Sequence, residues 1–80
     1  LGDIHVSMPT DYRARITVQA KRLFRVYADA EQYIEVEHGI FITRSALYID
    51  ESGNTSLVSD DQFPLVELTI SGTFGDAYLS

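Results

Sequence analysis

Apolar and polar residues alternate from Ala14 to Ala28, and this alternation constrains the fold more than any other feature of the chain. The even-numbered positions are Ala14, Ile16, Val18, Ala20, Arg22, Phe24, Val26 and Ala28. Only Arg22 interrupts this apolar set, and a period of two residues is typical of a β-strand that buries one face. Because 15 residues is long for one strand, we expect a bend or a tight turn near Lys21 and Arg22.

A helix over residues 20–38 is the main alternative for this region. Leu23, Tyr27 and Ile34 fall on a helical stripe. The charges oppose a long helix, because basic residues would lie at its positive N-terminal end and glutamates at its negative C-terminal end. A short helix near residues 29–34 stays open as an alternative to a turn.

A hairpin around residues 29–31 would satisfy both faces of the two strands that it joins. The predicted pairs are Val26–Ile34, Phe24–Val36, Arg25–Glu35 and Tyr27–Tyr33. Apolar residues meet apolar residues, opposite charges meet, and two aromatic rings meet. A shift of one residue would destroy all four matches, so the faces favour this register.

The rest of the chain alternates short β-like segments with turn-forming clusters. Gly39 can supply the positive φ of a two-residue turn after His38, and a switch of apolar parity predicts a bulge near Arg44 and Ser45. We expect strands at 40–49 and 55–59, turns at 50–54 and 60–62, and a last strand opened by Pro64. The predicted fold is all-β: an antiparallel β-meander of five or six strands, forming a small barrel or a curved sheet.

Eighty residues suffice for one domain. We divide the chain into residues 1–11, an N-terminal arm or a remnant foreign to the protein, residues 12–72, a single β domain, and residues 73–80, a C-terminal tail. A core of this size contributes little net stability, so small domains often depend on disulfides, a metal or a partner. The chain has no cysteine, which excludes disulfides and thiolate zinc sites.

The sequence predicts no catalytic, cofactor-binding or metal-binding residue, and we expect no enzymatic activity. His5 and His38 are too few and too far apart in the sequence to indicate a metal or catalytic site. The acidic stretch 50–61 has Thr55 and Asp61 where a calcium loop needs glycine and glutamate. It is therefore interpreted as turn and strand.

Charge is unevenly distributed along the chain. Residues 1–28 carry five basic and two acidic side chains, whereas residues 29–80 carry ten acidic side chains and one basic side chain, Arg44. The simplest interpretation is that basic strands pair with acidic strands inside one sheet. The alternatives are two functional faces, a head-to-tail contact between copies, and a nucleic-acid interface.

The nucleic-acid alternative rests on one basic strand face that carries an aromatic residue. Its residues are Arg13, Arg15, Lys21, Arg25 and Tyr27. Such a face can follow a phosphate backbone and stack bases. The acidic pI of about 4.5 disfavours nucleic acid as a partner, because nucleic-acid modules are usually strongly basic.

Apolar residues outside the central strands predict a protein-interaction surface. They are Ile4, Val6 and Met8 near the N-terminus and Phe74, Tyr78 and Leu79 near the C-terminus. Exposed strand edges and apolar surface favour association, so we expect a non-enzymatic assembly module that contacts a second copy or another protein through sheet edges. Without a signal peptide, a membrane-spanning segment or a cysteine, the sequence predicts a cytoplasmic protein that does not bind membranes.

Overall fold

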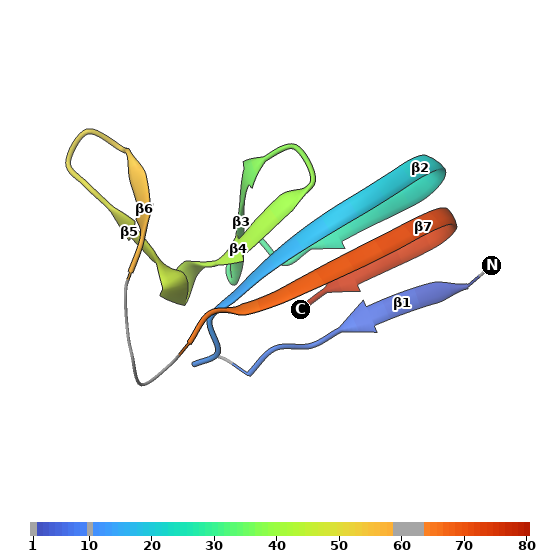
Figure 1. Ribbon diagram of the computed structural model, residues 1–80, viewed down its shortest axis with the longest axis horizontal. Coiled ribbons are helices and arrows are strands. Elements are labelled where there is room, and N and C mark those ends of the chain that lie inside the picture. The colour runs from blue at the N-terminus through green and yellow to red at the C-terminus, as the bar shows by residue number, and fades with distance from the viewer. Residues whose placement is uncertain (1, 10, 59–63) are drawn as a thin grey trace.

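The computed structural model describes residues 2–9, 11–58 and 64–80, and it is mostly β (Figure 1). The strands are β1 (Asp3–Val6), β2 (Ala14–Ala28), β3 (Tyr33–Glu37), β4 (Ile40–Thr43), β5 (Leu47–Ile49), β6 (Thr55–Leu57) and β7 (Val66–Leu79). A short 3-10 helix, η1 (Arg44–Ala46), separates β4 from β5. The all-β expectation is confirmed.

The strand order differs from a meander. Five strands form one sheet in the order β1-β7-β2-β4-β3, and β5 and β6 form a separate two-stranded sheet. β7 runs parallel to both β2 and β1, whereas β4 is antiparallel to β2 and β3. The antiparallel meander is therefore wrong, and the described strands do not close into a barrel. The long connection between β2 and β7 permits this parallel pairing, which no tight turn could make.

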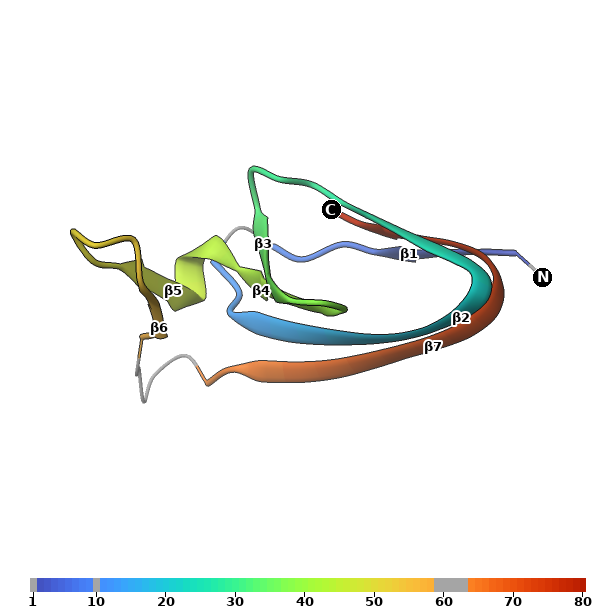
Figure 2. The ribbon, with the colours of Figure 1, turned by 90° about the horizontal axis from the view of Figure 1, so that it is seen from above.

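β2 and β7 fold back on themselves together (Figure 2). They stay paired from Ala14–Val66 to Ala28–Leu79, with a shift of register between Ala20 and Leu23. This confirms the bend expected near Lys21 and Arg22. Each strand therefore has a first and a second limb, and the two limbs lie in opposite layers of the folded sheet.

Gly72 makes room for the bend. It lies opposite Ala20, immediately before the shift in register, and a Cβ atom at this position would overlap the ring of Phe24. Only a residue without a side chain fits at position 72 while Phe24 stays in the core.

The core lies between the two limbs. Its buried members are Ile16, Phe24, Tyr33, Phe41, Ile70, Ala77 and Leu79. Even-numbered residues of β2 face this core on both limbs, as the alternation predicts, except at the bend, where Ala20 and Arg22 are exposed. The shift in register thus preserves the buried face while the strand reverses direction.

The predicted hairpin register is wrong, and of the two alternatives left open for residues 29–34, a short helix or a turn, the structure has the turn. Residues 29–32 form a turn in which the Tyr33 amide donates to the Asp29 carbonyl oxygen at 2.9 Å. β3 then pairs with β4, not with β2. The pairs Val26–Ile34, Phe24–Val36, Arg25–Glu35 and Tyr27–Tyr33 do not form, because β3 pairs with β4 instead.

β7 offers β2 a longer match than β3 could. Arg25 lies opposite Asp76, and Tyr27 lies opposite Tyr78, so the charge and aromatic matches are made with a different strand. Pairing with β7 continues over nearly all of β2, whereas β3 has only five residues. The second limb of β2 is therefore matched by β7, and β3 is matched by β4.

The turn predictions hold where the structure describes them. Residues 38–39 form a turn in which Gly39 has a φ of +80°, and Gly53 has a φ of +85° in the turn before β6. Near Arg44 the chain forms η1 where a bulge was expected. The expected turn at 60–62 lies outside the described residues.

The two terminal segments join the main sheet. β1 pairs with the second limb of β7, from Asp3–Asp76 to Val6–Leu79. Residues 73–79, expected as part of a tail, form that second limb. The Met8 amide donates to the carbonyl oxygen of Ser80 at 2.9 Å, which joins the segment after β1 to the last residue.

Candidate functional site

The β5–β6 hairpin projects from one end of the molecule (Figure 1). Its strands pair with each other, from Leu47–Leu57 to Ile49–Thr55, and with no other described strand. The exposed fractions of Tyr48, Ile49 and Leu57 are 61%, 50% and 46%. A two-stranded hairpin in water is only marginally stable, and exposed apolar residues gathered on one make it a candidate interaction surface.

Local chemistry explains why the hairpin forms at this place. The Asp50 carboxylate accepts hydrogen bonds from the amides of Ser52 and Asn54, each at 2.9 Å, and so closes the turn. At the base, the Val58 amide donates to the carbonyl oxygen of buried Ala46 at 2.8 Å. The hairpin is therefore anchored at its base while its tip stays exposed.

Two strand edges in the main sheet have no partner along part of their length. β4 pairs with β2 only along Arg15–Thr17, and β1 pairs with β7 only from Asp76 onward. Within the described residues, segments 23–28 and 66–72 are therefore paired on one side only. Such edges present backbone N–H and C=O groups to any strand that can reach them.

The edge of the first limb of β7 is the more accessible of the two. The Val66 amide donates to the Arg13 carbonyl oxygen at 2.8 Å, so it points toward β2. Because amide direction alternates along a strand, the amides of Glu67, Thr69 and Ser71 point to the open side. The side chains of these three residues are exposed, so none has to leave the core to admit another strand.

A cleft of about 530 Å³ lies beside the open edge of β2, between the two layers. Val18, Phe24, Val26 and Phe41 line it, together with polar groups that include Glu35. The volume falls within the range of small-molecule sites. The Glu35 carboxylate already accepts a hydrogen bond from the Gly39 amide at 3.1 Å, so its main role is to fix the turn.

An aromatic row crosses the outer face of the second limbs. His5 stacks on Tyr78 with ring centroids 4.9 Å apart, and Tyr27 stacks on Tyr78 at 5.4 Å. Desolvation raises the pKa of the Tyr78 phenol, and the negative charges of Asp76 and Asp3 raise it further. Because both faces of the Tyr78 ring are already stacked, its role is to join three strands.

The interaction residues predicted from the sequence separate into two groups. Val6 and Met8 pack against the core, and Leu79 is buried in it. Tyr78 belongs to the aromatic row. Ile4 and Phe74 are exposed, and they are the members of the set that offer most surface to a partner.

The residues of the nucleic-acid alternative are divided by the bend. Arg13 is buried, and Arg15 forms an ion pair with Glu67. Arg25 follows the bend, so its limb lies in the opposite layer from the limb that carries Arg15 (Figure 2). The ion pair confirms, at this position, the interpretation that basic and acidic strands pair inside one sheet.

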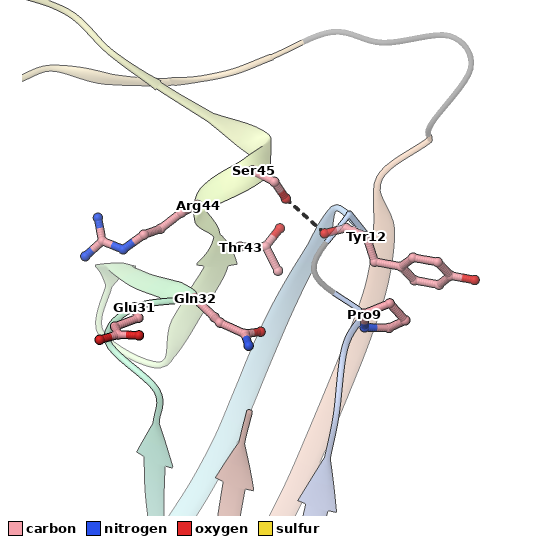
Figure 3. Close-up of a pocket in the computed structure, with 7 residues that line it drawn as sticks. All are labelled: Pro9, Tyr12, Glu31, Gln32, Thr43, Arg44 and Ser45. Carbon is pink, nitrogen blue, oxygen red and sulfur yellow. Dashed lines mark hydrogen bonds between the residues drawn. The ribbon is translucent and has the colours of Figure 1, made fainter.

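A smaller pocket of about 190 Å³ lies where the N-terminal segment meets η1 (Figure 3). The Ser45 hydroxyl donates to the Tyr12 carbonyl oxygen at 3.0 Å, and the Arg44 Nε donates to the Ala30 carbonyl oxygen at 2.9 Å. These polar side chains hold neighbouring segments together. The pocket is smaller than typical ligand sites, and the Ser45 hydroxyl is already engaged with the Tyr12 carbonyl oxygen.

Two further features are absent from the described residues. No group of three or more His, Asp or Glu side chains there is arranged to hold a metal ion. No helix in the described part of the chain is long and apolar enough to span a membrane. The candidate functional features are therefore the projecting hairpin, the two open edges and the cleft.

Sequence reasoning missed the hairpin as a surface. Tyr48, Ile49 and Leu57 were assigned only to strands, because alternation indicates a buried face without showing whether another element covers it. The available signal was the shortness of both strands around an acidic turn at Asp50 and Glu51. Short paired strands of this kind need a third strand or a partner.

Comparisons with models of protein families, with curated proteins and with solved structures found no match to this chain. The function is therefore inferred from the surfaces of the molecule itself.

Proposed function

We propose that this chain is a non-enzymatic protein–protein assembly module that associates with itself through exposed sheet edges. The observation that carries the proposal is the open edge of β7 along residues 66–72, where alternate amides point away from β2. A second strand added there would satisfy these groups and extend the sheet.

The β7 edge is compatible with a second copy of itself. A two-fold axis at Thr69 would set Leu68 against Ile70 of the second copy, and Glu67 against its Ser71. Apolar residues would then meet apolar residues, and no like charges would lie opposite each other. Such an isologous contact is the commonest arrangement in homodimers.

The test is a substitution that blocks the edge without touching the core. Thr69→Pro removes an amide that points to the open side, and proline is tolerated at such edge positions. The matched control is Thr69→Ala, which keeps the amide. We expect sedimentation to show association of the parent and of Thr69→Ala, and association at least about tenfold weaker for Thr69→Pro, a change of about 1.4 kcal/mol, with an unchanged circular dichroism spectrum.

Two outcomes would count against edge assembly. One is a monomeric parent at about 100 μM, a hundredfold above a Kd of about 1 μM. The other is association that survives Thr69→Pro unchanged. Tight, salt-sensitive binding to single-stranded oligonucleotides, lost on charge reversal at Arg25, would favour the nucleic-acid alternative instead.

A further inference from the structure

The hairpin combines exposed apolar residues with negative charge. Leu47, Ile49 and Leu57 lie on one face of the two strands, since Leu47 pairs with Leu57 and Ile49 follows two positions later. Asp50 and Glu51 stand at the turn, and residues 45–58 contain no basic side chain. The tip is therefore apolar on one face and acidic at its end.

The opposite end of the molecule has the complementary character. At the bend of β2 and β7, Leu23 lies opposite Phe74, and their exposed fractions are 59% and 51%. Lys21 and Arg22 are exposed immediately before Leu23. Two large apolar side chains are thus next to two positive charges.

These surfaces lie at the two ends of the long axis, which measures 40 Å (Figure 1). A chain cannot bring its own hairpin to its own bend across this length while its sheet stays intact. The complement of each surface is available only on another molecule.

We propose that the β5–β6 hairpin of one copy docks on the β2–β7 bend of a second copy, head to tail. Ile49 and Leu57 would cover Leu23 and Phe74, while Asp50 and Glu51 would approach Lys21 and Arg22 of the second copy. Complementary charges would set the orientation of this contact, and burial of the apolar residues would supply most of its affinity.

This contact has a consequence that edge pairing lacks. A head-to-tail contact leaves one hairpin and one bend free at the ends, so copies add until a ring closes or a filament grows. It uses neither the β7 edge nor its amides, and it therefore stands or fails separately from the proposed edge assembly.

A second copy can cover both the hairpin and the bend. An anionic membrane would also attract a bend that carries exposed Leu23 and Phe74 beside two basic residues. It would leave the acidic hairpin uncovered, because negative lipid repels Asp50 and Glu51. The membrane is therefore an outcome to be tested, and the second copy is the inference.

The experiment reverses the charges of each end in the Thr69→Pro background, so that edge pairing does not contribute. The hairpin variant is Glu51→Lys with Ser52→Lys, which leaves the Asp50 carboxylate to close the turn. The bend variant is Lys21→Glu with Arg22→Glu, and a combined variant carries all four changes. Glu31→Lys with Glu37→Lys reverses two exposed charges elsewhere and is the matched control. Sedimentation over a concentration series measures the association constant of each.

We expect the hairpin and bend variants to associate at least about tenfold more weakly than Thr69→Pro alone, a change of about 1.4 kcal/mol. The control variant should have the same association constant as Thr69→Pro alone. The combined variant should recover association, because opposite charges meet again with inverted sign. If the single-end variants lost association because they unfolded, adding the other two substitutions would not restore it, so recovery would show that the variants are folded.

Three results would overturn the inference. The first is a parent that stays monomeric in this background at about 100 μM. The second is a combined variant no better than the single-end variants. The third is a protein that is monomeric in solution but binds vesicles of phosphatidylserine and phosphatidylcholine through Lys21 and Arg22.

Discussion

The folded β2–β7 pair and the β5–β6 hairpin are built from the same kind of alternating sequence, yet they end in opposite states. Along β2, Ile16 and Phe24 are buried because two limbs face each other across a core. Along β5, Ile49 is half exposed because no described strand lies over the hairpin. Alternation determines which residues share a face, whereas the partner of that face determines whether it becomes core or surface.

The contrast also separates stability from assembly. Residues between the limbs hold the fold together, and we propose that residues on the hairpin hold copies together. Matched substitutions in the two regions test this separation.

The largest effect is expected when isoleucine is replaced by alanine in the core and, separately, in the hairpin. Ile16→Ala should destabilise the fold by about 2–5 kcal/mol, because it leaves a cavity around a fully buried side chain. Ile49→Ala should change stability by less than about 0.5 kcal/mol and weaken association instead. Urea unfolding with sedimentation measures both, and equal destabilisation at the two positions would refute the contrast.

A smaller effect is expected at the bend. Gly72→Ala places a Cβ atom where the Phe24 ring lies, so we expect destabilisation of about 1–3 kcal/mol from overpacking. Phe24→Leu opens space, and Gly72→Ala should cost less in that background. A double-mutant cycle measures this coupling. Additive effects would show that the bend does not depend on this contact.

The smallest effect concerns alkaline pH. Burial raises the pKa of the Tyr33 phenol above its ordinary value of 10.0, and the negative charge of Asp29 raises it further. The folded state therefore holds this proton more tightly than the unfolded state. The resulting stability is fully present below pH 10.0 and is lost as pH rises from there through the folded-state pKa.

Tyr33→Phe tests this dependence. It removes the hydrogen bond from the phenol to the Ser80 carbonyl oxygen, which spans 3.2 Å, and should cost about 1 kcal/mol at neutral pH. Above pH 10.0 the variant should lose less stability than the parent does. Tyr48→Phe, in the exposed hairpin, is the control, and an alkaline loss that is identical in parent and Tyr33→Phe would contradict the assignment.

Much of the local structure could be predicted because it depends on neighbouring residues. The buried parity of β2, its bend near Lys21 and Arg22, and the turn at Gly39 all follow from alternation, strand length and the freedom of glycine. The turn at 50–54 follows from the Asp50 carboxylate and Gly53. These features need no knowledge of distant segments.

The candidate surfaces could be predicted only in part. Phe74 and Ile4 are exposed, whereas Leu79 and Met8 pack inside, although all four are apolar residues near the chain ends. Composition places such residues at the termini without showing which of them β1 and β7 cover. The hairpin was not predicted as a surface because exposure depends on the absence of a third strand.

The class of the fold, the inward face of β2 and the turns at 38–39 and 50–54 could be predicted, because they depend on contacts within a few residues. The pairing of distant segments became visible only in the folded chain, where Arg25 lies opposite Asp76 and not Glu35, and where Leu23 and Phe74 meet at an exposed bend. The alternation in β2 shows which side chains share a face, but it does not show which segment pairs with each edge of the strand. β7, far along the chain, takes one edge because it can pair with β2 over most of its length.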